Sequence, residues 1–204
     1  MAITISGSGI TSANIADGTI VNADVADVAA SKLTGALPAI DGSALTGMSG
    51  GLYESIAIIC DRKSAGTGGG VFTSGAWRTR DLNTEVSDVD NIVSISSNQF
   101  TLVAGTYTIK WVTPAHKVNA HASALYNITT SSFEEYSNTA YNQQDTWQTS
   151  HVSGMAVVSG SQIFEIQHRC QTTQSAVNGM GYHINNVDSS ADTNYTLVEI
   201  YKHT

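Results

Sequence analysis

Apolar residues recur at every fifth position along the first part of the chain. The positions are Ile5, Ile10, Ile15, Ile20 and Val25, and the residues between them are mostly Ser, Thr, Gly, Ala, Asn and Asp. A helix repeats a face about every 3.6 residues and a strand about every two, so this period matches neither element. One chain with this spacing buries no core by itself. We therefore expect several copies to pack these side chains around a common axis.

A short helix is predicted directly after this repeat. Val25, Val28 and Leu33 lie at helix spacing, and Gly35 suits the end of a helix. A helix of about a dozen residues is marginal on its own. Val28 and Leu33 are therefore expected to join the same axis in a bundle of identical chains. We assign residues 1–51 to a fibrous stalk and attachment segment with one short helix.

The pattern changes to strand-like alternation from residue 52 onward. Apolar side chains alternate at Phe100 and Leu102, before a turn at Ala104-Gly105, and again after it. We expect a hairpin there, in which one side of the second strand faces the core and the other faces outward. The expected core positions are Tyr107, Ile109 and Trp111, and the expected outward positions are Thr106, Thr108 and Lys110.

Further strands are predicted throughout this second part of the chain. They lie near 55–62, 91–96, 118–128, 147–158, 161–171, 180–185 and 194–202. The whole chain has two prolines, and this region has no convincing helix pattern. The sequence therefore predicts an all-β head, a jelly-roll sandwich over residues 52–204.

Charge is sparse in this chain, and the balance is acidic. Charged residues make up 13% of the chain, against about 25% in an average protein. The formal net charge of −8 argues against a nucleic-acid partner, which needs a basic face. No apolar run is long enough to span a membrane, and no basic residue follows Met1 as in an export signal. A virion protein, assembled in the host cytoplasm and released by lysis, fits this combination.

Candidate metal and catalytic groups are few. None of the six histidines is paired as H-x-H or H-x-x-x-H. The run from Asp88 to Asn91 offers oxygen atoms that calcium prefers, but an acidic turn has the same sequence. Glu134 and Glu135 are adjacent, so a strand would point them to opposite faces. We expect no enzyme activity, no cofactor and no metal.

The two cysteines leave two alternatives open. Cys60 and Cys170 are too few for a disulfide framework, although one bridge is possible. Two buried, reduced thiols are the favoured alternative.

Aromatic rings gather among amides and hydroxyls in the segment 131–151. Tyr136, Tyr141 and Trp147 lie there among Ser, Asn and Gln residues. Sugar rings bind by stacking on aromatic faces and by directional hydrogen bonds to such polar groups. We therefore predict receptor binding through these three residues, in a loop region near 133–147.

The opposite interpretation of these rings is that they fill the core. It stays open for Phe133 and Trp147. Tyr136 and Tyr141 have uniformly polar neighbours, which favours exposure. Trp77, close to two arginines, is expected to be structural.

Several segments resemble known families. Residues 66–86 (GTGGGVFTSGAWRTRDLNTEV), 100–111 (FTLVAGTYTIKW), 164–170 (FEIQHRC) and 195–202 (YTLVEIYK) are similar to C-terminal domains of bacteriophage tail-fibre proteins. Their order also resembles the complement globular-head and tumour necrosis factor-like jelly roll. The N-terminal segment is similar to linker segments of phage fibres. The resemblance implies a homotrimer, a tail-appendage location in the virion and a host-surface receptor.

These observations together indicate a homotrimeric phage tail-fibre protein that binds the host cell surface during adsorption. The expected partners are two identical chains, other virion tail or head proteins through the N-terminal segment, and a host glycan or outer-membrane protein. The alternative is a structural virion component, such as a head fibre, decoration or collar protein, without receptor binding. A small depolymerase is disfavoured, because the chain is too short for the long β-helix that usually presents the two carboxylates.

Overall fold

The computed structural model describes residues 52–183 and 190–204, and within them the chain is all-β. The predicted axis positions and the predicted short helix lie outside the described residues. The eleven strands are β1 (Tyr53–Lys63), β2 (Arg78–Thr79), β3 (Thr84–Asp88), β4 (Val93–Ser96), β5 (Gln99–Leu102), β6 (Thr106–His116), β7 (Asn119–Asn127), β8 (Ser132–Asn142), β9 (Thr149–Ser159), β10 (Ile163–Cys170) and β11 (Thr193–His203).

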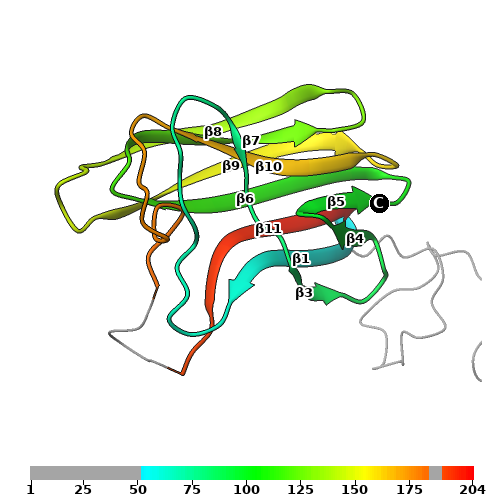
Figure 1. The fold of residues 1–204 in the computed structure, drawn as a ribbon. Helices are drawn as coiled ribbons and strands as arrows, with labels where there is room; N and C mark the ends of the chain where they lie inside the picture. The colour runs from blue at the N-terminus through cyan, green and yellow to red at the C-terminus, as the bar shows by residue number, and fades with distance from the viewer. Residues whose placement is uncertain (1–51, 184–189) are drawn as a thin grey trace, which may run out of the picture. The chain divides into compact units, whose positions relative to one another are not determined.

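The strands form two antiparallel sheets that face each other (Figure 1). The five-stranded sheet has the order β3-β1-β11-β6-β9, and the six-stranded sheet has the order β4-β5-β10-β7-β8, with β2 paired to β10. Strands distant in sequence are neighbours in both sheets, and consecutive strands often lie in opposite sheets. The fold is a jelly-roll sandwich, as the alternation of apolar and polar residues predicts.

The predicted hairpin around Ala104-Gly105 is wrong in one respect. The turn joins β5 to β6, but β5 pairs with β4 and β10, whereas β6 pairs with β11 and β9. The chain therefore crosses from one sheet to the other at this turn. The turn at Gly160 makes the same crossing in reverse, and its N–H donates to the carbonyl of Gly105 over 2.8 Å. Alternation alone cannot distinguish a hairpin from such a crossing.

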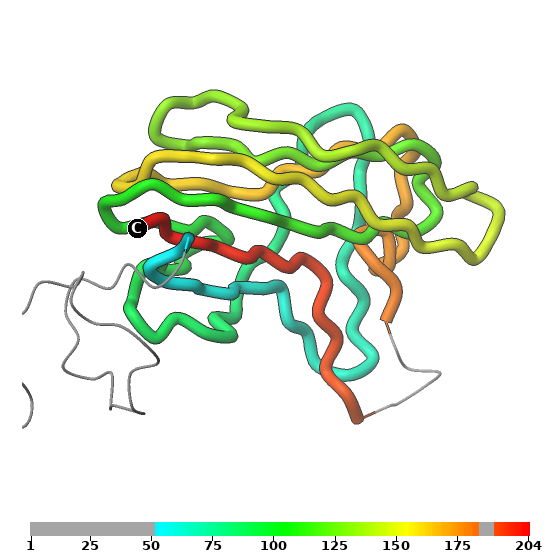
Figure 2. The backbone as a smooth tube through the Cα atoms, turned by 180° about the vertical axis from the view of Figure 1, so that it is seen from behind, coloured from blue at the N-terminus to red at the C-terminus, as the bar shows by residue number. Residues whose placement is uncertain are grey.

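Other strand boundaries also differ from the sequence predictions. Most of the region 133–147, predicted as a loop, is the long edge strand β8. The short strands β2 and β3 were not predicted, and residues 180–183 form no strand. The segment between β1 and β2, residues 64–77, runs along one end of the sandwich and reaches the level of β8 (Figure 2). It brings Trp77 to the six-stranded sheet.

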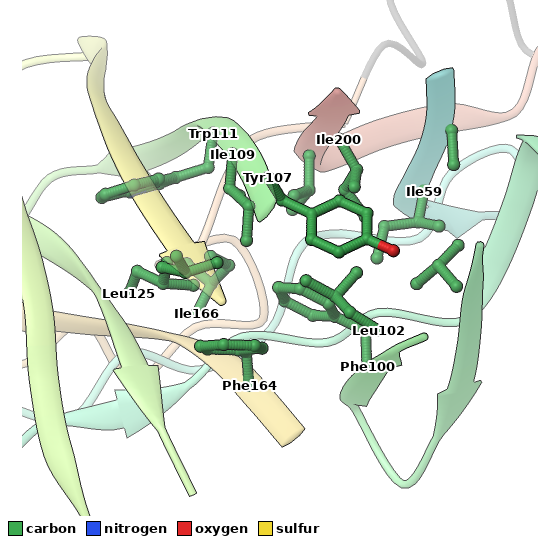
Figure 3. Close-up of a cluster of buried hydrophobic side chains, with 14 of the residues drawn as sticks. Ile59, Phe100, Leu102, Tyr107, Ile109, Trp111, Leu125, Phe164, Ile166 and Ile200 are labelled. Carbon is green, nitrogen blue, oxygen red and sulfur yellow. The ribbon is translucent and has the colours of Figure 1, made fainter. Parts of the chain in front are cut away.

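The core lies between the two sheets. Tyr107, Ile109 and Trp111 are all buried, as predicted, and they face Phe164 and Leu125 of the other sheet (Figure 3). The indole N–H of Trp111 donates to the hydroxyl of Ser123 over 2.9 Å and so links the sheets.

Two of the three predicted outward positions on β6 are exposed. Thr106 and Lys110 face solvent, whereas Thr108 keeps only 7% of its surface exposed. Thr108 lies between β11 and β9, and its hydroxyl is 2.8 Å from a ring nitrogen of His203. Neighbouring side chains therefore cover it on the outer face.

Buried polar groups form a second layer next to this core. Arg80 is fully buried, and it donates hydrogen bonds to the Thr196 hydroxyl and the Met180 carbonyl, each over 2.8 Å. Burial lowers the pKa of Arg80 to about 10. His121 and His168 share a hydrogen bond of 2.9 Å between their rings.

Both cysteines are buried, free thiols. Cys60 belongs to β1 and Cys170 to β10, in opposite sheets. Burial raises the pKa of both thiols.

Candidate binding surface

Three alanines occupy alternate positions of β7, the strand next to the edge of the six-stranded sheet. Ala120, Ala122 and Ala124 face outward, because the alternate residues His121 and Ser123 between them are buried and face the interior. Alanine projects only a methyl group. The sheet is therefore lower along this strand than along its neighbours.

Larger side chains stand on both sides of the alanine row. Directly opposite residues of an antiparallel pair share a face, with Cβ atoms about 4.5–5.5 Å apart. On β8, Tyr141, Thr139 and Tyr136 lie opposite Ala120, Ala122 and Ala124 respectively. On β10, Arg169 lies opposite Ala122, and Gln167 lies opposite Ala124.

Trp77 closes one end of this row. Its ring centroid lies 5.2 Å from that of Phe133 and 5.8 Å from that of Tyr136. Phe133 also packs edge-on against Tyr126 at 4.9 Å. Trp77 is half-buried in this cluster of rings, which fixes its orientation. The aromatic rings are thus part of the outer surface of the sheet and do not fill the core.

The result is an open groove of about 280 Å³. We call it the alanine groove, and its side walls and floor are Trp77, Ala120, Ala122, Thr139, Arg169 and Gln171. His121 and Cys170 line it from beneath.

The lining of the alanine groove carries one positive charge. Arg169 is exposed and has no ion pair or side-chain hydrogen bond within the described part of the chain. Burial lowers the pKa of His121 to about 4 and raises that of the Cys170 thiol to about 11, so both are neutral at pH 7. The groove therefore combines an apolar floor, an aromatic wall and a single unpaired guanidinium.

Gln171, directly after β10, is fixed beside the groove by hydrogen bonds to Ala120. Its backbone N–H donates to the Ala120 carbonyl over 2.8 Å, and its side-chain oxygen accepts from the Ala120 N–H over 3.3 Å. The side-chain NH₂ group of Gln171 remains available, as does the hydroxyl of Thr139 on the opposite wall. Both groups are positioned to bind a ligand that rests on the alanines.

Trp147 lies apart from the two tyrosines, in the connection between β8 and β9. The ammonium group of Lys117 stacks over its ring at 4.2 Å, and its edge meets Tyr182 at 5.5 Å. Trp147 also lines a separate cleft of about 220 Å³ with His116 and Asn178. It is 74% exposed, so it does not fill the core.

The three residues predicted to bind a receptor therefore occupy two places. Tyr136 and Tyr141 share the outer face of the six-stranded sheet, where they are 52% and 63% exposed. Sequence reasoning missed the alanine row, although the spacing of Ala120, Ala122 and Ala124 is visible in the sequence. Trp77 packs on Phe133 and Tyr136, as a structural residue would, and it also lines the alanine groove.

The outer face of the other sheet also carries apolar residues, among polar ones such as Lys110 and Glu199. We call it the five-stranded face, and its exposed or half-exposed apolar residues include Ile56, Ile58, Val112, Met155, Val157 and Leu197. Met155 and Val157 lie opposite Lys110 and Thr108 on β6, which places them on the outward side of β9. They are 58% and 64% exposed.

The acidic run near residue 90 forms a turn. The carboxylate of Asp88 accepts hydrogen bonds from the N–H groups of Ile92 and Val93, each over 2.9 Å. Asp90 binds the hydroxyl of Ser55. Among the described residues, no three His, Cys, Asp or Glu side chains are grouped so that they would hold a metal ion.

No helix in residues 52–183 or 190–204 is long and apolar enough to cross a membrane.

The chain is similar to several solved structures. No protein-family model matches it, and no curated protein matches it. The PRD1 vertex protein P5 is 13% identical with a TM-score of 0.48, over 76% of this chain and all (100%) of that one. The globular domain of zebrafish complement 1qA protein is 12% identical with a TM-score of 0.46, over 72% of this chain and 96% of that one. Murine APRIL is 8% identical with a TM-score of 0.45, over 72% of this chain and 98% of that one. At these identities the likeness concerns the fold alone.

Proposed function

We propose that this protein is a homotrimeric virion protein of a bacteriophage, located on a tail fibre, that binds the host cell surface. The observation that carries the proposal is the alanine groove with its exposed tyrosines. It is a concave, largely apolar site with a few polar groups, which is the usual form of a ligand site.

Exposed apolar residues on the five-stranded face support assembly into a trimer. Large apolar patches on a soluble protein mark interaction sites. A second and a third copy of the chain are the expected occupants, because the five-residue aliphatic period of residues 1–51 also calls for several identical chains. The head would then place one sheet against its neighbours and keep the other sheet free.

The two sheets thus have different roles in this proposal. The five-stranded face assembles, and the six-stranded sheet, with Tyr136, Tyr141 and the alanine groove, faces the host. Three equal sites in one head raise avidity about 10²–10⁴-fold over one site without any new contact. The N-terminal segment attaches the trimer to other virion proteins in this arrangement.

The competing function is that of a structural virion component, such as a head fibre, decoration or collar protein. The five-stranded face alone would suffice for it, whereas an exposed aromatic groove would have no role. Fluorescently labelled full-length protein, tested against a panel of bacterial cells, distinguishes the two. We expect saturable binding to some strains, and absence of binding to every strain would favour the structural component. Reducing sugar measured in the same incubations should stay at background, because we propose adhesion without catalysis.

A further inference from the structure

We propose that the alanine groove binds an acidic sugar residue, a pyranose ring carrying a carboxylate, of a host-surface polysaccharide. This inference rests on the proposed adhesion and names the ligand class of the site. Three properties of the groove carry it: an unpaired cation, an apolar floor, and free polar groups on both walls.

The cation is Arg169. The chain has 9 Lys and Arg against 17 Asp and Glu, so acidic partners for a surface arginine are abundant. Arg169 nevertheless has none among the described residues, and it stands beside methyl groups. A planar guanidinium binds a carboxylate through two parallel hydrogen bonds, which is geometrically specific. Charge complementarity therefore favours an anionic ligand here.

The floor and the end wall fit a sugar ring. A pyranose presents an apolar face of C–H groups, which packs on flat apolar surface and on aromatic rings. Ala120 and Ala122 offer such a surface, and Trp77 stands at its end, held by Phe133 and Tyr136. The floor has no side-chain torsions that binding would have to fix.

The walls add hydrogen bonds that a bare carboxylate would not use. Thr139 on one wall and the NH₂ group of Gln171 on the other are free to bind sugar hydroxyls. The volume of about 280 Å³ lies just below the range for pockets of drug-sized ligands, which is about 300–1,000 Å³. One sugar residue is therefore the expected occupant, and the open side leaves room for the adjoining residues of a polysaccharide.

The test compares acidic and neutral oligosaccharides of the same length. Full-length protein is titrated calorimetrically with short oligogalacturonates and with short maltooligosaccharides. We expect binding of the acidic series only, weakened as salt rises. Arg169→Gln should weaken this binding about tenfold or more, because hydrogen bonds to charged groups are among the strong ones. Ala122→Leu, which fills the floor but leaves the charge, should abolish it.

Matched variants locate the site. Lys117→Gln removes one positive charge beside Trp147, in the other cleft, and should leave oligogalacturonate binding unchanged. Both groove variants should keep the thermal midpoint of the wild type, because Arg169 and Ala122 face outward on the sheet.

Several results would overturn the inference. One is equal binding of neutral and acidic oligosaccharides, and another is no binding of either. A third is loss of oligogalacturonate binding in Lys117→Gln but not in Arg169→Gln. A fourth is self-association of the protein in sedimentation experiments that Ala122→Leu abolishes. Cell binding that persists in the Arg169→Gln protein would overturn the acidic-sugar assignment and leave adhesion intact. Oligogalacturonate binding without any cell binding would instead overturn the proposed adhesion.

Discussion

Trp111 of β6 lies directly against Gly154 of β9. The two residues are paired in register, and a Cβ atom on Gly154 would lie 2.0 Å from Cζ2 of the indole ring. The ring occupies the volume that a side chain at position 154 would need. We expect Gly154→Ala to lower the free energy of unfolding by about 1–3 kcal/mol, the usual cost of overpacking a core. Chemical denaturation measures this, and Ser153→Ala, which faces outward next to it, is the control. Equal stability of the two variants would mean that the ring moves aside freely.

Removing the Trp111 indole ring should lower the free energy of unfolding more than adding a methyl group at position 154. Trp111→Ala empties a large buried site and should lower the free energy of unfolding by about 3–5 kcal/mol. Lys110→Ala, on the exposed side of the same strand, should cost well under about 1 kcal/mol, since it loses only the contact of its ammonium group with the Tyr201 ring at 4.9 Å. Urea unfolding of both variants checks the assignment of the two faces, and similar losses would contradict it.

Acid should destabilise the head through its buried histidines. Burial and the neighbouring Arg80 lower the pKa of His121 to about 4 and hold that of His168 well below its ordinary value. The folded state therefore binds these protons less readily than the unfolded state. Their contribution to stability is full above pH 6.5, the ordinary value, and is lost as the pH falls toward about 4.

The measurement is the free energy of unfolding at several pH values between 6.5 and 4.5. Its decline should be smaller in a His121→Gln, His168→Gln double variant, whereas the exposed His151→Gln should behave as wild type. If the double variant does not fold, ring-proton NMR of the wild type reports the two titrations directly. Titration of both rings near pH 6.5 would contradict the burial argument.

The exposed tyrosines should matter for adhesion and little for folding. Tyr141 is 63% exposed, so Tyr141→Ala should change the free energy of unfolding by less than about 0.5 kcal/mol and weaken binding to host cells. Tyr141→Phe keeps the ring and should retain more binding. Tyr136→Ala also loses the contact with Phe133 at 5.1 Å, so its effect on stability should be larger. Unchanged cell binding in a double Tyr136→Ala, Tyr141→Ala variant would move the receptor site elsewhere on the head.

The five-stranded face should hold the trimer together. Met155→Asp with Val157→Asp would place charges on exposed apolar positions of β9, where neighbouring copies would pack. We expect the trimer of this variant to dissociate at a protein concentration at least about tenfold higher than the trimer of the wild type does. The reason is that each apolar side chain contributes about 1.5–3 kcal/mol when fully buried. Light scattering over a dilution series measures this. Val177→Asp, 61% exposed in the loop after β10, is the control. A stable monomer for the wild type would refute the trimer.

Local pattern predicted most of the strands but not β2, β3 or β8, and it did not predict how the strands connect. The alternation from Tyr107 to Trp111 identified the buried side of β6, because a strand with one buried face must alternate. The crossing at Gly105 was missed, since both a hairpin and a crossing need a tight turn between alternating runs. The edge strand β8 was read as a loop because it is exposed on most of its length and so lacks an apolar period.

The candidate site was predictable only in part. Tyr136 and Tyr141 are exposed as their polar neighbours indicated, and the register of β8 against β7 brings them beside the alanines. Trp77 joins them from a segment more than fifty residues earlier, a contact that depends on the path of residues 64–77 around the sandwich. No local feature of the sequence predicts the contact between Trp77 and Tyr136.

The methyl floor of the groove has a consequence for host range. Its shape is set by the backbone of β7, and the residues that would recognise a ligand stand on the neighbouring strands. Thr139 belongs to an edge strand whose outward side chains contribute nothing to the core, and Arg169 faces solvent on β10. Substitutions on these walls can therefore change the receptor while the sandwich stays equally stable. If the protein is the phage adhesin proposed above, replacing a few wall residues while keeping the floor would let it follow changes in the host's envelope.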